Sequence, residues 1–486
     1  METYHNFLEK VCTLTGFSTD QIIFVSSVFL CVPFGAFYRK VLHPSRVSSK
    51  TRQTVGLLAG LFLSWLSFKW QTLIMAGVTA LCYVLTVIIN PKLVHRYVSL
   101  VAMGILSAAH LYRQITDYGS YVLDYTGPLM IITQKIIYVA FSVHDGMGRD
   151  ESNLNAEQKK EKLKKVPSPL EYFGYVFHYS NILIGPVGTY HEYTDFITGT
   201  VFNTKGDEPA DPSPLKATVE KLSSAVLCVV VFVVASPRFP VASNADPYFI
   251  DNTPFIYRLI YAWLSIVATR MRYYFAFKAG EAINNICGLG FGGYDEEGNP
   301  SWNKMSNANI TKLELAQNMK MLLDNWNIST AVWLRRIVYD RVTSHRTLAT
   351  FLLSAFWHGF YGGYYLTFIT CQILVEAARV ARRTLREHFQ GSKMTSRFYD
   401  VITCVVTMVF VTYATVPFVL LDPWKGLRFW RSLYFFGHIG SLLALLVLRG
   451  KPSRPQPKPT NQDANRNGIL TSMTCAVKNL NPREGS

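Results

Sequence analysis

Charged side chains are scarce in this chain. Asp, Glu, Lys and Arg make up 16% of its 486 residues, whereas a soluble protein typically carries about 25%. Hydrophobic residues make up 49% of the chain. This balance excludes an ordinary soluble domain and favours a protein whose outer surface lies in lipid.

Long apolar runs recur along most of the chain. The strongest lie at 21–37, 54–68, 72–89, 222–235, 401–421 and 441–448, and weaker ones at 97–115, 129–143, 170–187, 255–277 and 429–440. A helix needs about 20 mostly apolar residues to cross a bilayer, and no segment shows the alternation typical of barrel strands. We therefore predict an all-α fold, a polytopic membrane helical bundle of roughly ten to twelve transmembrane helices or half-helices.

Paired cysteines and metal-binding clusters are also missing. The eight cysteines form no CxxC pair and mostly lie inside apolar runs, at 12, 31, 82, 228, 287, 371, 404 and 475. They predict small buried side chains and neither a disulfide framework nor a zinc site. The acidic run Asp295, Glu296 and Glu297 lies in a glycine-rich turn, so we predict no metal site.

The net charge of +16 is concentrated between the apolar runs and near the ends. Basic clusters follow the first run, precede Pro167, span 379–397 and open the tail at Arg449. The positive-inside rule places them in the cytosol, which makes residues 1–20 lumenal and residues 451–486 a disordered cytosolic tail, with one membrane domain at 21–450. The clusters flank apolar runs, so lipid headgroups are nearer anions than nucleic acid, and we predict no nucleic-acid partner.

His358 is an ionisable residue inside the apolar segment FLLSAFWHGFYGGYYLTFIT (351–370). If 351–365 is one helix, His358 shares a face with mostly small or polar residues: Phe351, Ser354, Ala355, Tyr361, Gly362 and Tyr365. That face is expected to point into the bundle, as intramembrane ionisable groups usually do. Burial disfavours the charged imidazole, which suits a general base. The alternative is a neutral ring that only links helices.

A second polar segment, LLDNWNISTAVWLRRIVYDRV (322–342), contains Asn327 near its start and Arg335 and Arg336 further along. It predicts an amphipathic helix at the membrane interface, with tryptophan anchors and arginines that reach the headgroups. Asn327 lies where asparagine favours the N-cap of a helix.

These motifs resemble the membrane-bound O-acyltransferase family, and within it the lysophospholipid acyltransferase branch. The resemblance rests on Trp326-Asn327-Ile328, on LSAFWHG (353–359) and on GYY (363–365). It continues in DYTGPLMIITQKI (124–136), HDG (144–146), GPVGTYHEYTDFI (185–197), RYYFAFKAGEAINN (272–285) and VPFVLL (416–421), and covers nearly everything from 20 to 450. Gly362 departs from the family pattern, since a proline is usual there.

The resemblance implies that His358 and Asn327 are catalytic. His358 would be the general base that takes the proton from the free glycerol hydroxyl of a lysophospholipid. Asn327 would either orient that hydroxyl or donate its amide to the carbonyl oxygen, and the sequence leaves both roles open. No serine or cysteine lies in a nucleophile motif, and a thiolate leaves readily. We therefore predict direct transfer from acyl-CoA without a covalent intermediate.

The implied substrates are acyl-CoA, which acts as co-substrate with no further cofactor, and lysophosphatidylethanolamine, -serine or -choline from the bilayer. These substrates favour a central reaction chamber where two tunnels meet. The resemblance also implies residence in the endoplasmic reticulum membrane. The predicted walls of the chamber are Trp326, Trp357, Tyr274 and Tyr365. Arg335 and Arg336 are candidates for the CoA phosphates, because guanidinium groups match phosphate geometry; membrane anchoring is the alternative.

Two other functions remain open at this stage. One is a family member that acylates a sterol, a diacylglycerol or a protein. The other is a transporter in which His358 relays protons. Transporters usually show internal repeats and several intramembrane charges, whereas this chain shows no repeat and its predicted spans hold almost no ionisable side chains besides His358. We make no prediction of the oligomeric state.

Overall fold

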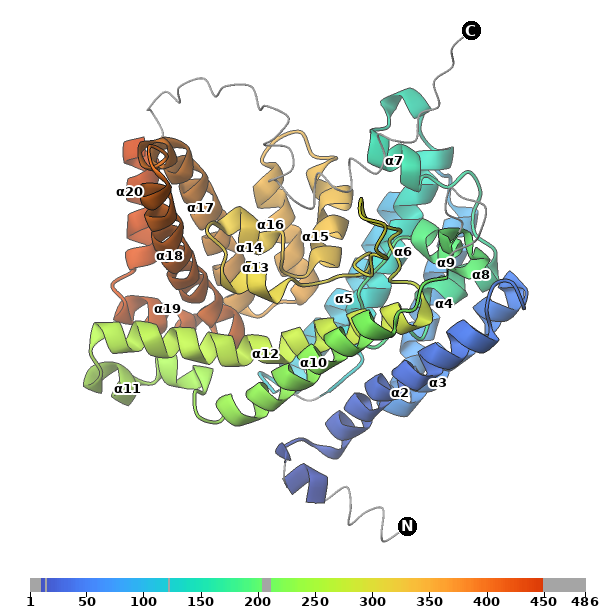
Figure 1. Cartoon of the computed structure of the whole chain (residues 1–486), viewed down its shortest axis with the longest axis horizontal. Coiled ribbons are helices and arrows are strands. Elements are labelled where there is room, and N and C mark those ends of the chain that lie inside the picture. The colour runs from blue at the N-terminus through green and yellow to red at the C-terminus, as the bar shows by residue number, and fades with distance from the viewer. Residues whose placement is uncertain (1–9, 14, 121–122, 203–210, 449–486) are drawn as a thin grey trace.

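The computed structural model describes residues 10–448, except for residue 14 and segments 121–122 and 203–210 (Figure 1). The described residues form helices joined by loops, with one isolated β-bridge between Tyr294 and Pro300. Six of the described helices are long and apolar enough to cross a membrane, and a bent helix pair adds a seventh if it forms one span. The predicted all-α membrane fold is confirmed. The predicted disordered tail, 451–486, lies outside the described residues.

The N-terminal group of helices lies together on the right of Figure 1. It comprises α2 (Thr19–Val41), α3 (Ser49–Phe68), α4 (Gln71–Ile88), α5 (Val94–Thr116), α6 (Thr126–Met147), α7 (Ala156–Glu161), α8 (Pro169–Val176) and α9 (Tyr190–Thr198). Several of these helices begin at side-chain caps, such as the capping box of Ser18 with Gln21 on α2, which satisfies N–H groups that have no partner within the helix. α6 is the most enclosed membrane helix of this group, with most of its residues buried.

The middle of the chain supplies a long base and three short helices. It comprises α10 (Leu215–Ala235), α11 (Pro247–Asn252), α12 (Phe255–Cys287), α13 (Ile310–Glu314), α14 (Met319–Leu323), α15 (Ile328–Leu334) and the π-helical turn η4 (Arg335–Tyr339). α10 and α12 lie side by side along the lower edge of Figure 1. α12 also contacts both α2 and α18, so it connects the two halves of the molecule.

The C-terminal group lies on the left of Figure 1, except for its first helix, which lies in the middle beside the short helices. It comprises α16 (Arg346–His358), α17 (Gly362–Leu385), α18 (Lys393–Leu420), α19 (Pro423–Ser432) and α20 (Phe436–Leu448). α17 packs against α16, α18 and α20. A smaller apolar cluster forms where α12 meets α18 and α19, around Tyr413 and Trp430.

Large apolar side chains cover the outside of several membrane helices. Examples are Leu227 on α10, Val405 on α18 and Leu446 on α20, all exposed. An apolar surface of this kind would be unfavourable in water but suits contact with lipid tails. The molecule is therefore a membrane protein by its surface as well as by its helix lengths.

Three predicted helices are interrupted. The apolar segment 170–187 forms only α8, and its remaining residues run as irregular backbone through the core. Segment 351–365 breaks at Gly359, which separates α16 from α17. The predicted amphipathic helix at 322–342 is divided too, into the end of α14, then α15 and η4. Hydrophobicity alone did not reveal the first two breaks, because both lie within mostly apolar sequence, whereas the break between α14 and α15 coincides with the polar residues Asp324, Asn325 and Asn327.

The expectation that the spans hold almost no ionisable side chains besides His358 is wrong. Lys135 on α6 is fully buried and donates hydrogen bonds to the carbonyl oxygens of Tyr175, at 2.9 Å, and Val176, at 3.0 Å. These carbonyls belong to the last turn of α8, where no helical N–H can reach them. The side-chain amine of Lys135 thus supplies the hydrogen bonds that no backbone N–H group can give to these carbonyl oxygens.

The close approach of α3 to the chain after α8 requires glycine at position 60. A Cβ atom at Gly60 would lie 1.6 Å from the carbonyl oxygen of Phe177. We predict that Gly60→Ala lowers the apparent melting temperature of the detergent-solubilised protein, since forced repacking of this kind costs about 1–3 kcal/mol. Gly77→Ala on α4 is the matched control, because no atom lies within 4 Å of its added Cβ. Equal melting temperatures for the two variants would contradict the packing described here.

Candidate active site

One large cavity lies inside the helix bundle, with a volume of about 1480 Å³. Both Asn327 and His358 line it. Its walls also include residues of α2, α5, α6, α12 and α17. Ligand pockets commonly have volumes of roughly 300–1,000 Å³, so this cavity has room for more than one small substrate.

Asn327 is the N-cap residue of α15, as predicted, but its side chain does not cap the helix. Its backbone is left-handed, with φ 46° and ψ 54°, a conformation that asparagine tolerates better than most residues. The capping role passes to Asn307, whose Oδ1 atom accepts a hydrogen bond of 2.9 Å from the backbone N–H of Ser329. Relieved of this role, the Asn327 side chain is available to the cavity.

His358 is the last residue of α16. The helix ends there because Gly359 adopts φ +122° and ψ −158°, a region that only glycine occupies without strain. The ring of His110 on α5 also leaves little space, since a Cβ atom at Gly359 would lie 3.2 Å from its Cγ. The histidine is thereby held at a helix end with its ring against the cavity.

The hydrogen bonds of His358 determine which ring nitrogen is free. Its Nδ1 atom lies 2.7 Å from the carbonyl oxygen of Ser354. A carbonyl oxygen only accepts hydrogen bonds, so Nδ1 carries the proton and, in the neutral ring, Nε2 carries the lone pair. Nε2 has no hydrogen-bond partner among the described residues. The ring packs against both Phe368 and Phe418, with centroid distances of 5.2 and 5.4 Å.

α6 holds both site helices in place. Gln134 on α6 donates a hydrogen bond of 3.1 Å to the hydroxyl of Thr330 on α15. The indole N–H of Trp357 on α16 donates to the carbonyl oxygen of Met130 on α6, at 3.2 Å. α6 is mostly buried. The two helix ends that carry Asn327 and His358 are therefore both hydrogen-bonded to one well-packed helix.

Two of the four aromatic residues predicted to line the chamber do so. Trp326 and Trp357 line the cavity, whereas Tyr274 and Tyr365 do not. Tyr274 lies behind Trp326, with ring centroids 5.9 Å apart, and donates its hydroxyl to Glu314. Tyr365 was expected to share a face with His358 in one continuous helix. Because the chain restarts at Gly362, Tyr364 lines the cavity in its place.

The two arginines predicted to bind the CoA phosphates lie in different surroundings. Arg335 lines the cavity and lies 3.5 Å from a carboxylate oxygen of Asp340. Arg336 lies outside this cavity and forms ion pairs with Glu157 and Glu161 near α7. A phosphate group at Arg336 would have to displace two carboxylates, so Arg335 is the better placed of the pair.

Sequence analysis missed a row of arginines on α17. One face of this helix lines the cavity along its length, through Tyr364, Thr367, Phe368, Cys371, Val375, Ala378, Arg379, Arg382 and Arg383, and Arg386 at the start of the next turn, η5 (Arg386–Phe389), continues it. The spacing of three and four residues was the available signal, but the arginines had been assigned only to membrane topology. Tyr364 and Arg382 are 18 positions apart, which is about 27 Å along a helix, so the aromatic region near His358 and the basic region lie far apart in one cavity.

These features define a polytopic helical membrane protein that encloses a large chamber, with a histidine and an asparagine on its wall. The family model of the membrane-bound O-acyltransferases matches residues 111–420. The chain therefore belongs to the membrane-bound O-acyltransferase family and is an acyltransferase. Membership of this family argues against the transporter alternative.

Curated relatives agree with this assignment. Lysophospholipid acyltransferase 6 of Drosophila melanogaster is 41% identical over 447 residues, which are 90% of this chain and 62% of the relative. Membrane-bound glycerophospholipid O-acyltransferase 1 of Homo sapiens is 36% identical over 97% of each chain. Membrane-bound glycerophospholipid O-acyltransferase 2 of Gallus gallus is 39% identical over 92% of this chain and 88% of its own.

Gly359 generates a test of the geometry around His358. We predict that Gly359→Ala lowers both acyltransferase activity and thermal stability, because a non-glycine residue in this backbone conformation costs about 1–3 kcal/mol. Gly104→Ala on α5, where no atom lies within 4 Å of the added Cβ, serves as the control. Wild-type activity and melting temperature in Gly359→Ala would refute the helix break described here.

Proposed function

We propose that this protein is an acyl-CoA-dependent lysophospholipid O-acyltransferase. It transfers a fatty acyl group from the CoA thioester to the free glycerol hydroxyl of a lysophospholipid, with an ethanolamine, serine or choline headgroup. The observation that carries the proposal is the shared cavity, because Asn327 and His358 meet an aromatic region at one end and arginines at the other. The relatives named as lysophospholipid and glycerophospholipid acyltransferases support this choice of acceptor.

In the proposed mechanism, Nε2 of His358 takes the proton of the acceptor hydroxyl as the oxygen attacks the thioester carbonyl carbon. The carbonyl electron pair moves to oxygen and forms a tetrahedral oxyanion. When this intermediate collapses, the carbon–sulfur bond breaks and its electron pair leaves with sulfur. The thiolate then takes up the proton held on Nε2 of His358, which restores the neutral imidazole, so the products are the diacyl phospholipid and CoA. Both substrates occupy the cavity together, and no cofactor besides the co-substrate takes part.

The arginines of α17 suit the phosphate groups of CoA. Nη1 of Arg382 is buried and has no hydrogen-bond partner among the described residues, although Arg382 lines the cavity. A buried guanidinium nitrogen without a partner is costly unless a ligand binds it. We therefore move the expected phosphate site from Arg335 and Arg336 toward α17, where Arg379, Arg383 and Arg386 add positive charge.

The membrane topology follows from the same charges. With the basic clusters in the cytosol, acyl-CoA reaches the arginine end of the cavity from the cytosolic side, while the lysophospholipid enters from the bilayer. We propose residence in the endoplasmic reticulum membrane, with a lumenal N-terminus.

His358 provides the direct test of this function. We expect purified wild-type protein to release CoA thiol when given acyl-CoA with a panel of lysophospholipids, a sterol, a diacylglycerol and an acceptor peptide. His358→Ala should lower kcat by about 10²- to 10⁴-fold, the usual contribution of a general base. His438→Ala is the control, because this half-buried histidine bonds to Tyr413 and Thr370 and does not line the cavity. Thiol release only with a non-lysophospholipid acceptor, or normal turnover in His358→Ala, would reject the proposal.

Arg382 tests the site for CoA. We expect Arg382→Gln to raise the KM for acyl-CoA by about tenfold, the equivalent of one lost charge-assisted hydrogen bond, with little change in the KM for lysophospholipid. Arg397→Gln is the matched control, since Arg397 belongs to the same basic cluster but is exposed and outside the cavity. An S-acyl pantetheine donor, which lacks the nucleotide phosphates, should be used equally well by Arg382→Gln and wild type. A defect that persists with this donor would contradict phosphate binding by Arg382.

A further inference from the structure

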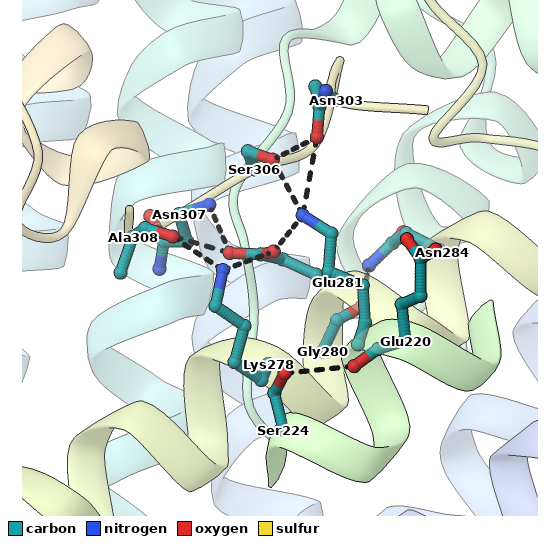
Figure 2. A network of polar contacts seen from close by, with 11 residues as sticks. Glu220, Ser224, Lys278, Gly280, Glu281, Asn284, Asn303, Ser306, Asn307 and Ala308 are labelled. Atoms are coloured by element: carbon teal, nitrogen blue, oxygen red, sulfur yellow. Dashed lines mark hydrogen bonds and ion pairs between the residues drawn. The ribbon is translucent and has the colours of Figure 1, made fainter. Parts of the chain in front are cut away.

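Asn327 lies at the end of a hydrogen-bond network that starts on α10 and α12. Figure 2 shows the centre of this network, the carboxylate of Glu281 on α12. One of its oxygens, Oε2, forms ion pairs with Lys278, at 2.8 Å, and with Lys221 of α10. Glu281 is only 1% exposed. The two lysines thus compensate a buried negative charge, which would otherwise be strongly unfavourable.

The other oxygen of Glu281 fixes the loop that precedes α13. Oε1 accepts hydrogen bonds from the backbone N–H groups of Asn307, at 2.8 Å, and Ala308, at 3.1 Å. Lys278 donates in turn to the carbonyl oxygen of Ala308, at 2.5 Å. The contacts around Asn307 and Ala308 can be followed in Figure 2. Asn307 is therefore bound to α12 through its backbone, and its side chain starts from a fixed position.

The orientation of the Asn307 amide follows from what it contacts. The backbone N–H of Ser329 can only donate, so the Asn307 atom that it meets at 2.9 Å is the oxygen, Oδ1. The hydroxyl of Ser329 donates to the same oxygen, at 2.9 Å. The other end of the amide is then Nδ2, and it donates to Oδ1 of Asn327 at 3.3 Å. Once Asn307 is fixed, the orientation of the Asn327 amide is fixed as well.

The consequence for Asn327 is that its oxygen is occupied and its nitrogen is not. Nδ2 of Asn327 has no hydrogen-bond partner among the described residues, and Asn327 lines the cavity. Rotating the Asn327 amide by half a turn would bring two N–H₂ groups face to face and lose the bond to Asn307. The network therefore selects one of the two orientations available to the amide.

We propose that Asn307 is a positioning residue that makes Asn327 a hydrogen-bond donor to the substrate. The N–H of Asn327 then points to the thioester carbonyl oxygen and stabilises the negative charge that develops on it. Asn327 gives up no proton; it only donates a hydrogen bond while the electron pair moves onto oxygen and returns when the carbon–sulfur bond breaks. The inference rests on the proposed function and decides between the two roles that the sequence left open.

Asn307→Asp is the variant that isolates this role. It keeps an oxygen for the N–H of Ser329 but places a second oxygen opposite Oδ1 of Asn327. The Asn327 amide should then turn, with its N–H₂ toward Asp and its oxygen toward the cavity. We expect kcat to fall by about 10²-fold, as when one donor to an oxyanion is removed, while both KM values stay close to wild type. The melting temperature should fall as well, because Asn307 is buried and a carboxylate at this position is costly.

Asn303→Asp is the matched control. Asn303 lies in the same loop, and its Oδ1 accepts from Lys221 at 3.3 Å, a contact that an aspartate preserves. It therefore introduces the same charge beside the same network without facing Asn327. We expect wild-type kcat in this variant, and a loss equal to that of Asn307→Asp would show that added charge alone inactivates the enzyme and would overturn the inference.

Two further measurements separate positioning from a general structural effect. Asn327→Asp keeps the carbonyl oxygen but loses the N–H₂ group, so it should be as inactive as Asn327→Ala. Adding Asn307→Asp to Asn327→Asp should cause little further loss, because the two residues act through one hydrogen bond. These comparisons remain decisive even if Asn307→Asp lowers the melting temperature, since the donor role of Asn327 is read from Asn327→Asp alone.

The outcomes distinguish this inference from the function on which it rests. Absence of thiol release by the wild-type protein, with every acceptor, would reject the proposed function. Normal wild-type turnover together with an active Asn327→Asp, or with an active Asn307→Asp, would reject only the donor role assigned here. Independent, multiplicative losses in the double variant would equally overturn the positioning role of Asn307.

Discussion

A polar group inside a membrane domain must find a hydrogen-bond partner in the protein, because no bulk water is available to supply one. Helix ends are the hardest case, since their last backbone groups have no partner within the helix. Two helix ends meet at the central cavity of this protein, and each carries a polar side chain. In both, one half of the side chain is bonded to the protein, and the other half has no hydrogen-bond partner among the described residues.

The cavity as a whole also has two chemically different regions. Near His358 the walls are aromatic, with Phe368 and Phe418 against the ring, which suits an acyl chain. Further along α17 the walls carry arginines, which suit an anionic group. One helix therefore supplies both environments, and an elongated substrate with an apolar and an anionic end can lie along it.

The sequence was informative where a residue type is unusual for its surroundings. His358 is a titratable group in an apolar segment, and Asn327 lies between tryptophan and isoleucine in a pattern shared with a family, so the sequence singled out both residues, and both line the cavity. Tyr365 was placed by assuming a continuous helix, and only the backbone of Gly359 reveals the break. Asn307 could not be found at all, because it caps a helix that begins 21 residues later in the sequence, and local propensity carries no signal of such a contact.

A structure of the enzyme with a non-reactive acyl-CoA analogue and a lysophospholipid would test the central claim most directly, because it would locate both reacting groups. The account predicts that the free glycerol hydroxyl lies within hydrogen-bond reach of Nε2 of His358, about 2.6–3.2 Å, and that the carbonyl oxygen of the donor faces Nδ2 of Asn327. A hydroxyl bound away from His358, or a carbonyl turned away from Asn327, would contradict it.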